Sequence, residues 1–155
     1  MYALFHGLVI TEEDVLYSPL PMYHTAAGLM VTGCAFTEGA STVARKKFSA
    51  SQFWADCVNH RVTVSPATRI ISLSVLSLFN NLRQAAQYIG ELARYLYATP
   101  VSEYETKHCL KMMFGNGMRM ELWQRFVDRF KVPKICEYYG STEGNCSISN
   151  LTGEK

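Results

Sequence analysis

The chain of 155 residues is 48% hydrophobic and carries 15 Lys and Arg against 13 Asp and Glu, which gives a net charge of +2. This length and composition are typical of one globular domain, and the near-neutral charge, with no like-charge run longer than Arg45-Lys46-Lys47, argues against a nucleic-acid-binding surface. Five cysteines without a C-x-x-C pair indicate a reducing compartment rather than a disulfide framework or a zinc site, and no apolar stretch reaches the roughly 20 residues that cross a bilayer.

Short β-rich runs alternate with helical segments along the chain. The N-terminal ten residues lack a basic flank and a cleavage site, which predicts a helix rather than a signal peptide. Gly28 and Gly33 would let an apolar helix approach its neighbours closely, and Gly39 would end that helix. Ser49 and Gln52 have the spacing of a capping box. The elements expected in this half are strand 15–21, helix 26–39, strand 41–48, helix 49–60 and strand 61–64.

The second half continues the alternation after one long connection. Residues 65–86 would join a strand to a helix, although such connections usually have about 4–6 residues. Their apolar spacing fits both a helix and a strand. The elements expected beyond them are helix 87–100, strand 110–117, helix 120–130 and strand 134–140. This order predicts an α/β fold in which helices flank a mostly parallel sheet.

Three polar loops would follow strands at the edge of the sheet where open parallel sheets bind ligands. They are "PMYHTAAG", which contains His24, then "GNGMR", and "YGSTEGN", which begins at Tyr139. Each has a simpler explanation, because Gly, Ser and Thr are common in turns and a lone histidine is often structural. The chain has no P-loop motif and no complete dinucleotide fingerprint. Glu143 differs, since a carboxylate beside Gly140 and Thr142 is suited to hold magnesium.

Five segments together resemble one known family. They are "YYGSTEGNCS", "FGNGMR", "LPMYHTAAG", "RKKFSASQFWADC" and "QYIGELARYL". These segments are similar to the fatty acid transport proteins, also called very long-chain acyl-CoA synthetases, of the adenylate-forming (AMP-binding) ligase superfamily. The Y-G-x-T-E core is specific to that superfamily, and the resemblance covers nearly the whole chain except residues 65–86.

The resemblance implies a two-step reaction. A long-chain or very long-chain fatty acid would react with ATP and magnesium to give an acyl-adenylate and pyrophosphate, and coenzyme A would then displace AMP to give a thioester. It also implies membrane association through parts of the full-length protein outside these residues. The catalytic domain would face the cytosol at the endoplasmic reticulum, the plasma membrane or the peroxisome.

The resemblance also implies roles for individual residues. The ring of Tyr139 would pack on one face of adenine, and the backbone of the "GNG" turn would flank the other side of the adenine. Thr142 would meet the α-phosphate, Glu143 would coordinate magnesium, and His24 would lie near the reacting carboxylate and the acyl pocket. The implied catalytic residues are Thr142, Glu143 and His24, the metal ligand is Glu143, and the cofactor-binding residues are Gly115, Asn116, Gly117, Tyr139, Gly140 and Ser141.

Several parts of the family's pattern do not occur in the 155 residues. They are the phosphate loop with its lysine, the ribose-binding aspartate, the hinge and the mobile C-terminal domain. We therefore expect residues 1–155 to be an internal piece of the large N-terminal domain, inactive alone and unable to bind coenzyme A by itself. Residues 65–86 are expected to be an atypical insertion, either genuine or, as we favour, translated non-coding sequence. The alternatives are a non-catalytic nucleotide-binding or acyl-binding interaction module and a flavodoxin-like nucleotide-binding domain.

Overall fold

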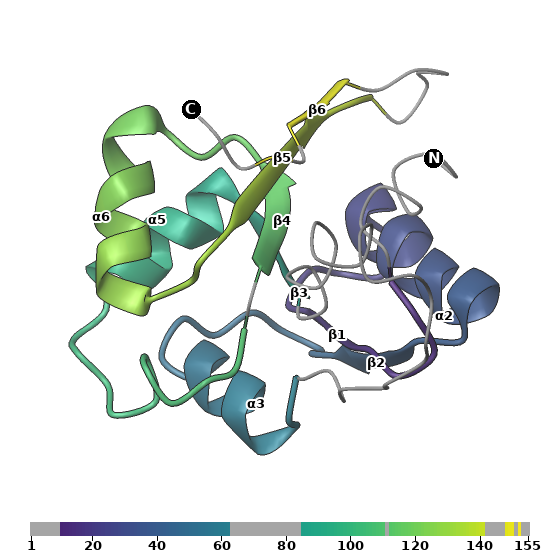
Figure 1. Cartoon of the computed structure of the whole chain (residues 1–155), viewed down its shortest axis with the longest axis horizontal. Coiled ribbons are helices and arrows are strands. Elements are labelled where there is room, and N and C mark those ends of the chain that lie inside the picture. Colours follow the sequence, from purple (N-terminus) through teal and green to yellow (C-terminus); the bar gives the residue numbers. More distant parts are fainter. Residues whose placement is uncertain (1–9, 63–84, 111, 142–147, 151, 153–155) are drawn as a thin grey trace, which may run out of the picture.

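A computed structural model describes residues 10–62, 85–110, 112–141, 148–150 and 152 (Figure 1). Its sheet has six strands in the order β2-β1-β3-β4-β5-β6, all parallel except β6, which runs antiparallel to β5. The strands are β1 Val15–Ser18, β2 Ser41–Ala44, β3 Ala85–Ile89, β4 Met112–Asn116, β5 Ile135–Tyr139 and β6 Ile148–Asn150. The helices are η1 Ala26–Val31, α2 Thr32–Glu38, α3 Phe53–Asn59, α5 Gly90–Ala98 and α6 Met120–Phe130.

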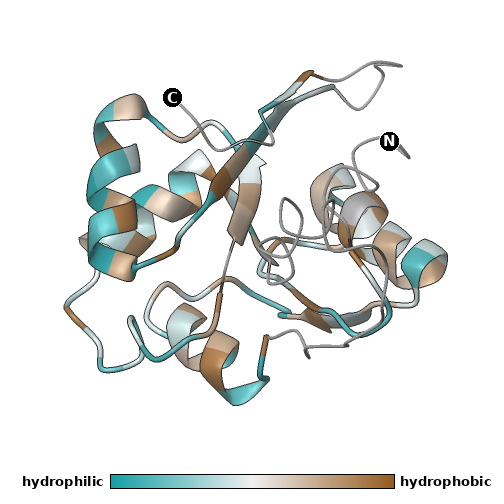
Figure 2. Ribbon diagram, viewed as in Figure 1, coloured by the Kyte–Doolittle hydropathy of each residue, from teal (hydrophilic) through white to brown (hydrophobic). Residues whose placement is uncertain are grey.

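The helices cover both faces of the sheet. Consecutive side chains of a strand point to opposite faces, so Met113 of β4 packs with α3, α5 and α6, whereas Met112 and Phe114 pack with η1 and α2. Figure 1 accordingly shows α5 and α6 on one side of β4 and α2 on the other. Hydrophobic and hydrophilic residues occupy different sides of α6, as Figure 2 shows. The predicted α/β architecture is therefore confirmed.

Most of the predicted elements occur where they were expected. The helix at 120–130 has the predicted bounds, and the strands at β1, β2, β4 and β5 lie within the predicted ranges. Gly39 ends α2 with a left-handed φ of 74°. A Cβ on Gly28 would lie 2.1 Å from the carbonyl oxygen of Met22, which confirms the close approach. The helix is less buried than predicted, since Phe36 is 86% exposed.

Two local predictions were wrong, and one strand was missed. Ser49 does not cap α3, because a turn follows it, in which Gln52 N donates to Ser49 O at 3.3 Å, and the helix begins at Phe53. The helix predicted over 87–100 begins at Gly90, because residues 87–89 belong to β3. The antiparallel strand β6 was not predicted at all.

The strand β3 begins inside the range assigned to the insertion. Ala85 and Ala86 pair with Met112 and Met113 of β4, so both belong to the central sheet. Residues 63–84 lie outside the described part of the chain, including residues 63–64 of the strand predicted over 61–64, and so do residues 1–9 of the helix predicted over the first ten residues. Residue 10 is described and is not helical. The described residues 61 and 62 are not in a strand.

The loop between α5 and β4 is joined to α6 by a buried ion pair. Arg129 Nη2 donates to Glu105 Oε1 at 2.6 Å, and Nε donates to Oε2 at 3.1 Å. The same guanidinium donates to the carbonyl oxygens of Tyr97 and Thr99 at 2.5 and 2.8 Å. Glu105 is only 3% exposed, so its charge depends on these partners and on Ser102 N.

The cysteines have mostly structural positions. Cys34, Cys57 and Cys136 are buried and Cys109 is exposed, and these four form no disulfide. Burial raises the pKa of the Cys34 thiol to about 12, which keeps this thiol protonated and unreactive at neutral pH.

Across the described residues, no helix has the length and apolar character needed to span a bilayer.

Candidate functional site

The loops predicted to form a site follow parallel strands that end at one edge of the sheet. The strands β1, β3, β4 and β5 end at Ser18, Ile89, Asn116 and Tyr139. Ile89 pairs with Asn116, and Gly115 pairs with Glu137, two residues before Tyr139. The turn after β4 therefore lies between the end of β3 and the end of β5.

Gly115 and Asn116 end β4 and Gly117 follows them, and we call these three residues the glycine turn. The glycine turn fits only because its neighbours approach it backbone to backbone. A Cβ on Gly115 would lie 2.1 Å from the carbonyl oxygen of Tyr88, and a Cβ on Gly90 would lie 1.7 Å from that of Gly117. Gly117 also has a left-handed φ of 75°. Packing thus requires glycine at positions 90 and 115, and the left-handed φ favours glycine at position 117.

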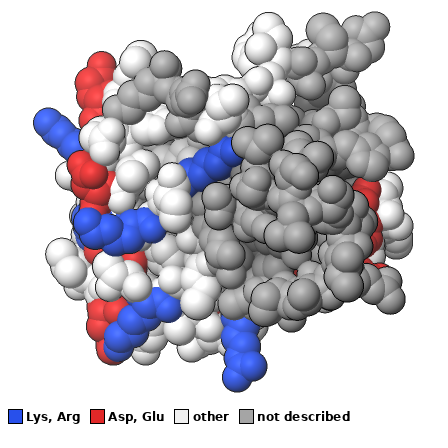
Figure 3. Space-filling view, in the orientation of Figure 1, with Lys and Arg blue, Asp and Glu red and all other residues white. Residues whose placement is uncertain are grey.

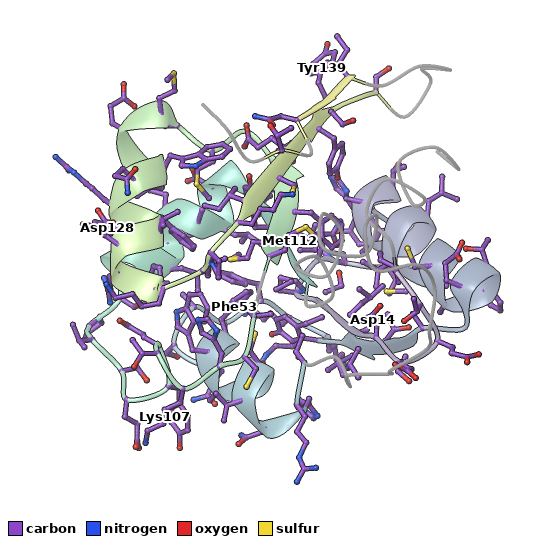
Figure 4. The ribbon with its side chains drawn as sticks, in the orientation of Figure 1. Asp14, Phe53, Lys107, Met112, Asp128 and Tyr139 are labelled. Atoms are coloured by element: carbon purple, nitrogen blue, oxygen red, sulfur yellow. The ribbon has the colours of Figure 1, made fainter. Side chains whose placement is uncertain are left out.

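Tyr139 ends the strand next to β4. It is the last residue of β5 and is 75% exposed, and Figure 4 shows it at the outer end of the strand. Gly140 and Ser141 are exposed as well. An exposed aromatic ring at the end of a strand offers a flat apolar face to a ligand.

His24 is held by the backbone that leads into η1. Its Nδ1 accepts a hydrogen bond from Ala26 N at 3.2 Å, and its carbonyl oxygen accepts from the N–H groups of Ala27 and Gly28 at 2.9 and 2.8 Å. The residue is exposed. These contacts fix the ring at the end of β1, which is separated from β4 by β3.

Gln87 links this segment to the sheet and was not found from the sequence. It is fully buried in β3, its Nε2 donates to Ala26 O at 2.6 Å, and its Oε1 accepts from Ser18 Oγ at 3.0 Å. A buried amide needs such partners on both ends. Its polar type in a central strand is the one signal that could have drawn attention to it.

Glu137 was also missed, although it precedes the predicted loop by two residues. Its Oε1 accepts hydrogen bonds from Met118 N at 2.7 Å and from Tyr88 Oη at 2.8 Å. The carboxylate therefore connects β5 both to β3 and to the chain just after the glycine turn.

The structure brings some of the predicted site residues together and leaves others untested. Gly115, Asn116 and Gly117 lie on the strand next to that of Tyr139, whereas His24 follows a more distant strand. Thr142 and Glu143 lie outside the described residues. Among the residues that are described, no three His, Cys, Asp or Glu gather as a metal site, so magnesium binding stays a prediction.

A cavity of about 530 Å³ adjoins the turn between the N-terminal halves of α5 and α6. Its walls mix charges of both signs, and one of its arginines, Arg94, is already paired with Glu91. Figure 3 likewise shows Lys and Arg interspersed with Asp and Glu over the described residues of that face. The three arginines of the cavity exceed its two glutamates by only one charge, which is too little to identify a ligand.

Comparison with known proteins supplies the family context. All 155 residues match the family described as AMP-binding enzyme. Long-chain fatty acid transport protein 1 of Mus musculus is 42% identical over 149 residues, which are 96% of this chain and 20% of that protein. The chain thus spans about a fifth of the length of the curated relatives it matches.

Solved structures share the fold at low sequence identity. The ATP-bound MatB from Rhodopseudomonas palustris superimposes with a TM-score of 0.70 at 16% identity, covering 96% of this chain and 25% of that one. The O-succinylbenzoate coenzyme A synthetase of Bacillus subtilis, solved with ATP and magnesium, gives a TM-score of 0.64 at 17% identity, covering 96% of this chain and 26% of that one.

Proposed function

The chain belongs to the AMP-binding enzyme family, and from this premise we propose that it is part of an ATP-dependent ligase that joins a long-chain or very long-chain fatty acid to coenzyme A. The substrate class is supported by the 40–43% identity to long-chain fatty acid transport proteins. Because such acids partition into bilayers, the proposed setting is a membrane-associated enzyme with a cytosol-facing catalytic domain. The endoplasmic reticulum, the plasma membrane and the peroxisome are the membranes that fit this setting.

The observation that carries the proposal is that β4, which ends in the glycine turn, pairs with β5, which ends in the exposed residue Tyr139. In the proposed site, adenine lies between this ring and the backbone of Gly115, Asn116 and Gly117, while Gly140 and Ser141 border the nucleotide. Stacking of a base on an aromatic side chain contributes about 1–3 kcal/mol. In the proposed site the opposite face of the base contacts the backbone of this turn.

The proposed chemistry needs no protein nucleophile. A carboxylate oxygen of the fatty acid attacks the α-phosphorus of ATP, the bond to the pyrophosphate oxygen breaks, and pyrophosphate leaves. The thiol of coenzyme A then attacks the acyl carbonyl, loses its proton, and displaces AMP. Both steps depend on positioning and on neutralising the charge on phosphate oxygens.

Within this scheme the chain's own residues bind and orient the reactants. The hydroxyl of Thr142 would donate to the α-phosphate, and Glu143 would hold magnesium, which supplies positive charge at the phosphates. His24, fixed by its hydrogen bonds to the start of η1, would face the fatty acid carboxylate.

Magnesium should tighten the binding of ATP by the chain, and Glu143→Gln should remove most of that gain. The amide keeps the shape of the side chain but loses the charge that attracts the cation. We expect about a tenfold lower dissociation constant for ATP with magnesium than with EDTA, corresponding to about 1.4 kcal/mol. Equilibrium dialysis against labelled ATP measures both constants.

Glu103→Gln is the matched control for this experiment. Its carboxylate is exposed and paired with Lys107 on the loop after α5, so its removal should leave the magnesium effect unchanged. An equal magnesium effect in Glu143→Gln and wild type would show that Glu143 is a turn residue. Binding of ATP by the full-length protein without formation of acyl-adenylate from oleate would favour a nucleotide-binding module over an active ligase.

A further inference from the structure

We propose that Glu137 is the positioning residue of the nucleotide site, holding the turn of Gly115, Asn116 and Gly117 at a fixed distance from Tyr139. The inference rests on the proposed function for its ligand, but its structural part concerns the chain alone. Glu137 itself has no proposed contact with the reacting atoms. It would act through the backbone of the turn.

The carboxylate contacts the turn where the chain leaves β4 for α6. Its Oε1 accepts from Met118 N at 2.7 Å, directly after Gly117. Hydrogen bonds to an ionised carboxylate are shorter and about twice as strong as those between neutral groups. The side chain of Met118 is buried in the core below α6, so the carboxylate fixes the direction of the backbone at a point already anchored on its other side.

Tyr88 holds the carboxylate in place from the neighbouring strand. Its hydroxyl donates to the same Oε1 at 2.8 Å, and the residue is fully buried. Burial, and then the charge of Glu137, raise the pKa of Tyr88, so the hydroxyl stays protonated and remains a donor. The carbonyl oxygen of Tyr88 lies 2.1 Å from the position that a Cβ on Gly115 would take. Tyr88 therefore restrains the turn both through its backbone at Gly115 and through its hydroxyl, which holds Glu137.

The turn needs such support because of its own composition. Gly115 and Asn116 are held by their pairing with β3, but Gly117 lies beyond the last paired residue and has no side chain that could pack. Glycine loses more conformational freedom on ordering than other residues. A ligand that had to order this backbone would bind more weakly, since ordering opposes binding. Glu137 and Tyr88 supply that order before the nucleotide arrives.

Two substitutions at Glu137 in the full chain separate this role from the effect of charge. Glu137→Ala removes the acceptor, so the amide of Met118 should lose at least tenfold of its protection against hydrogen exchange without nucleotide present. The same variant should bind ATP about tenfold more weakly, as equilibrium dialysis measures. Glu137→Gln keeps an oxygen acceptor at the same place and should stay within about threefold of wild type in both measurements.

Further variants keep the test decisive if Glu137→Ala fails to fold. Tyr88→Phe removes one of the two donors to Glu137 but retains the aromatic packing, and should give intermediate loss in both measurements. Glu103→Ala removes an exposed carboxylate far from the turn along the chain, paired with Lys107, and should change neither.

The outcomes that overturn the inference differ from those that overturn the proposed function. Unchanged Met118 protection in Glu137→Ala would show that the carboxylate does not hold the turn. Lost protection with unchanged ATP binding would show that the position of the turn does not matter to the nucleotide. A wild-type chain that binds no ATP would refute the function, while the exchange measurement would still decide whether Glu137 holds the turn.

Discussion

Replacing Gly90 with alanine should destabilise the fold by about 3 kcal/mol, although alanine is the better helix former by about 1 kcal/mol. Gly90 is the first residue of α5, and the added methyl carbon would lie 1.7 Å from the carbonyl oxygen and 2.4 Å from the carbonyl carbon of Gly117. Both atoms are backbone, so no side chain can rotate away. Relief of the collision requires α5 and the glycine turn to separate, and urea unfolding measures the loss.

Gly117→Ala is the control for this collision. A Cβ there would meet no atom closer than Gly90 N at 3.9 Å, so only its left-handed φ of 75° opposes the change. That conformation costs a non-glycine residue about 1–2 kcal/mol. A smaller loss for Gly90→Ala than for Gly117→Ala would mean that the close approach does not exist in solution.

Arg129→Met should lower the free energy of unfolding by about 3–5 kcal/mol, because removing one member of a buried ion pair leaves the other charge without compensation. The remaining charge would be that of Glu105, which is 3% exposed and would keep a hydrogen bond from Ser102 N. The carbonyl oxygens of Tyr97 and Thr99 would also lose their donor. Urea unfolding at pH 7 measures the change.

Lys107→Met provides the comparison, because it removes a cation of an exposed pair in the same loop. Lys107 and Glu103 are more than half exposed, and such pairs contribute about 0–1 kcal/mol. If the two variants lost equal stability, the burial of the Arg129 and Glu105 pair would contribute nothing.

The elements with one apolar stripe could be predicted from the sequence. In α6, Trp123, Phe126 and Phe130 are buried at helical spacing, and the predicted and observed bounds agree. The alternation of strands and helices was enough to give the parallel sheet, because each parallel connection needs a crossover, usually a helix.

The central strand β3 could not be predicted, for a physical reason. A strand buried on both faces needs no alternation of polar and apolar residues, and Ile89 happens to continue the stripe of Leu92 and Leu96 on α5. The polar side chain of Gln87 also argues against a buried strand. The partners that satisfy it, Ser18 and Ala26, are far away in sequence, so they could not be foreseen from local patterns. The edge strand β6 has the opposite problem, since its three residues bury little surface.

The candidate site was predicted in part for a similar reason. Its glycines and Tyr139 form recognisable short motifs, so their place at the end of neighbouring strands followed once the sheet was parallel. Glu137 acts through Tyr88 and Met118, contacts that depend on strand register. Local sequence patterns do not determine the register between strands that are so distant in sequence. The residues that support the turn were therefore identified only from the structure.

The most direct test of the central claim is a titration of the isotope-labelled chain with ATP, followed by the chemical shifts of its amides. The account predicts that the largest changes occur at Gly115, Asn116, Gly117 and Gly140. Tyr139→Ala should weaken binding at least about fivefold through the loss of stacking, whereas Tyr95→Ala, which removes a partly exposed ring on α5, should not. Unshifted glycine amides, or equal affinity of wild type and Tyr139→Ala, would contradict an adenine site between the turn and Tyr139.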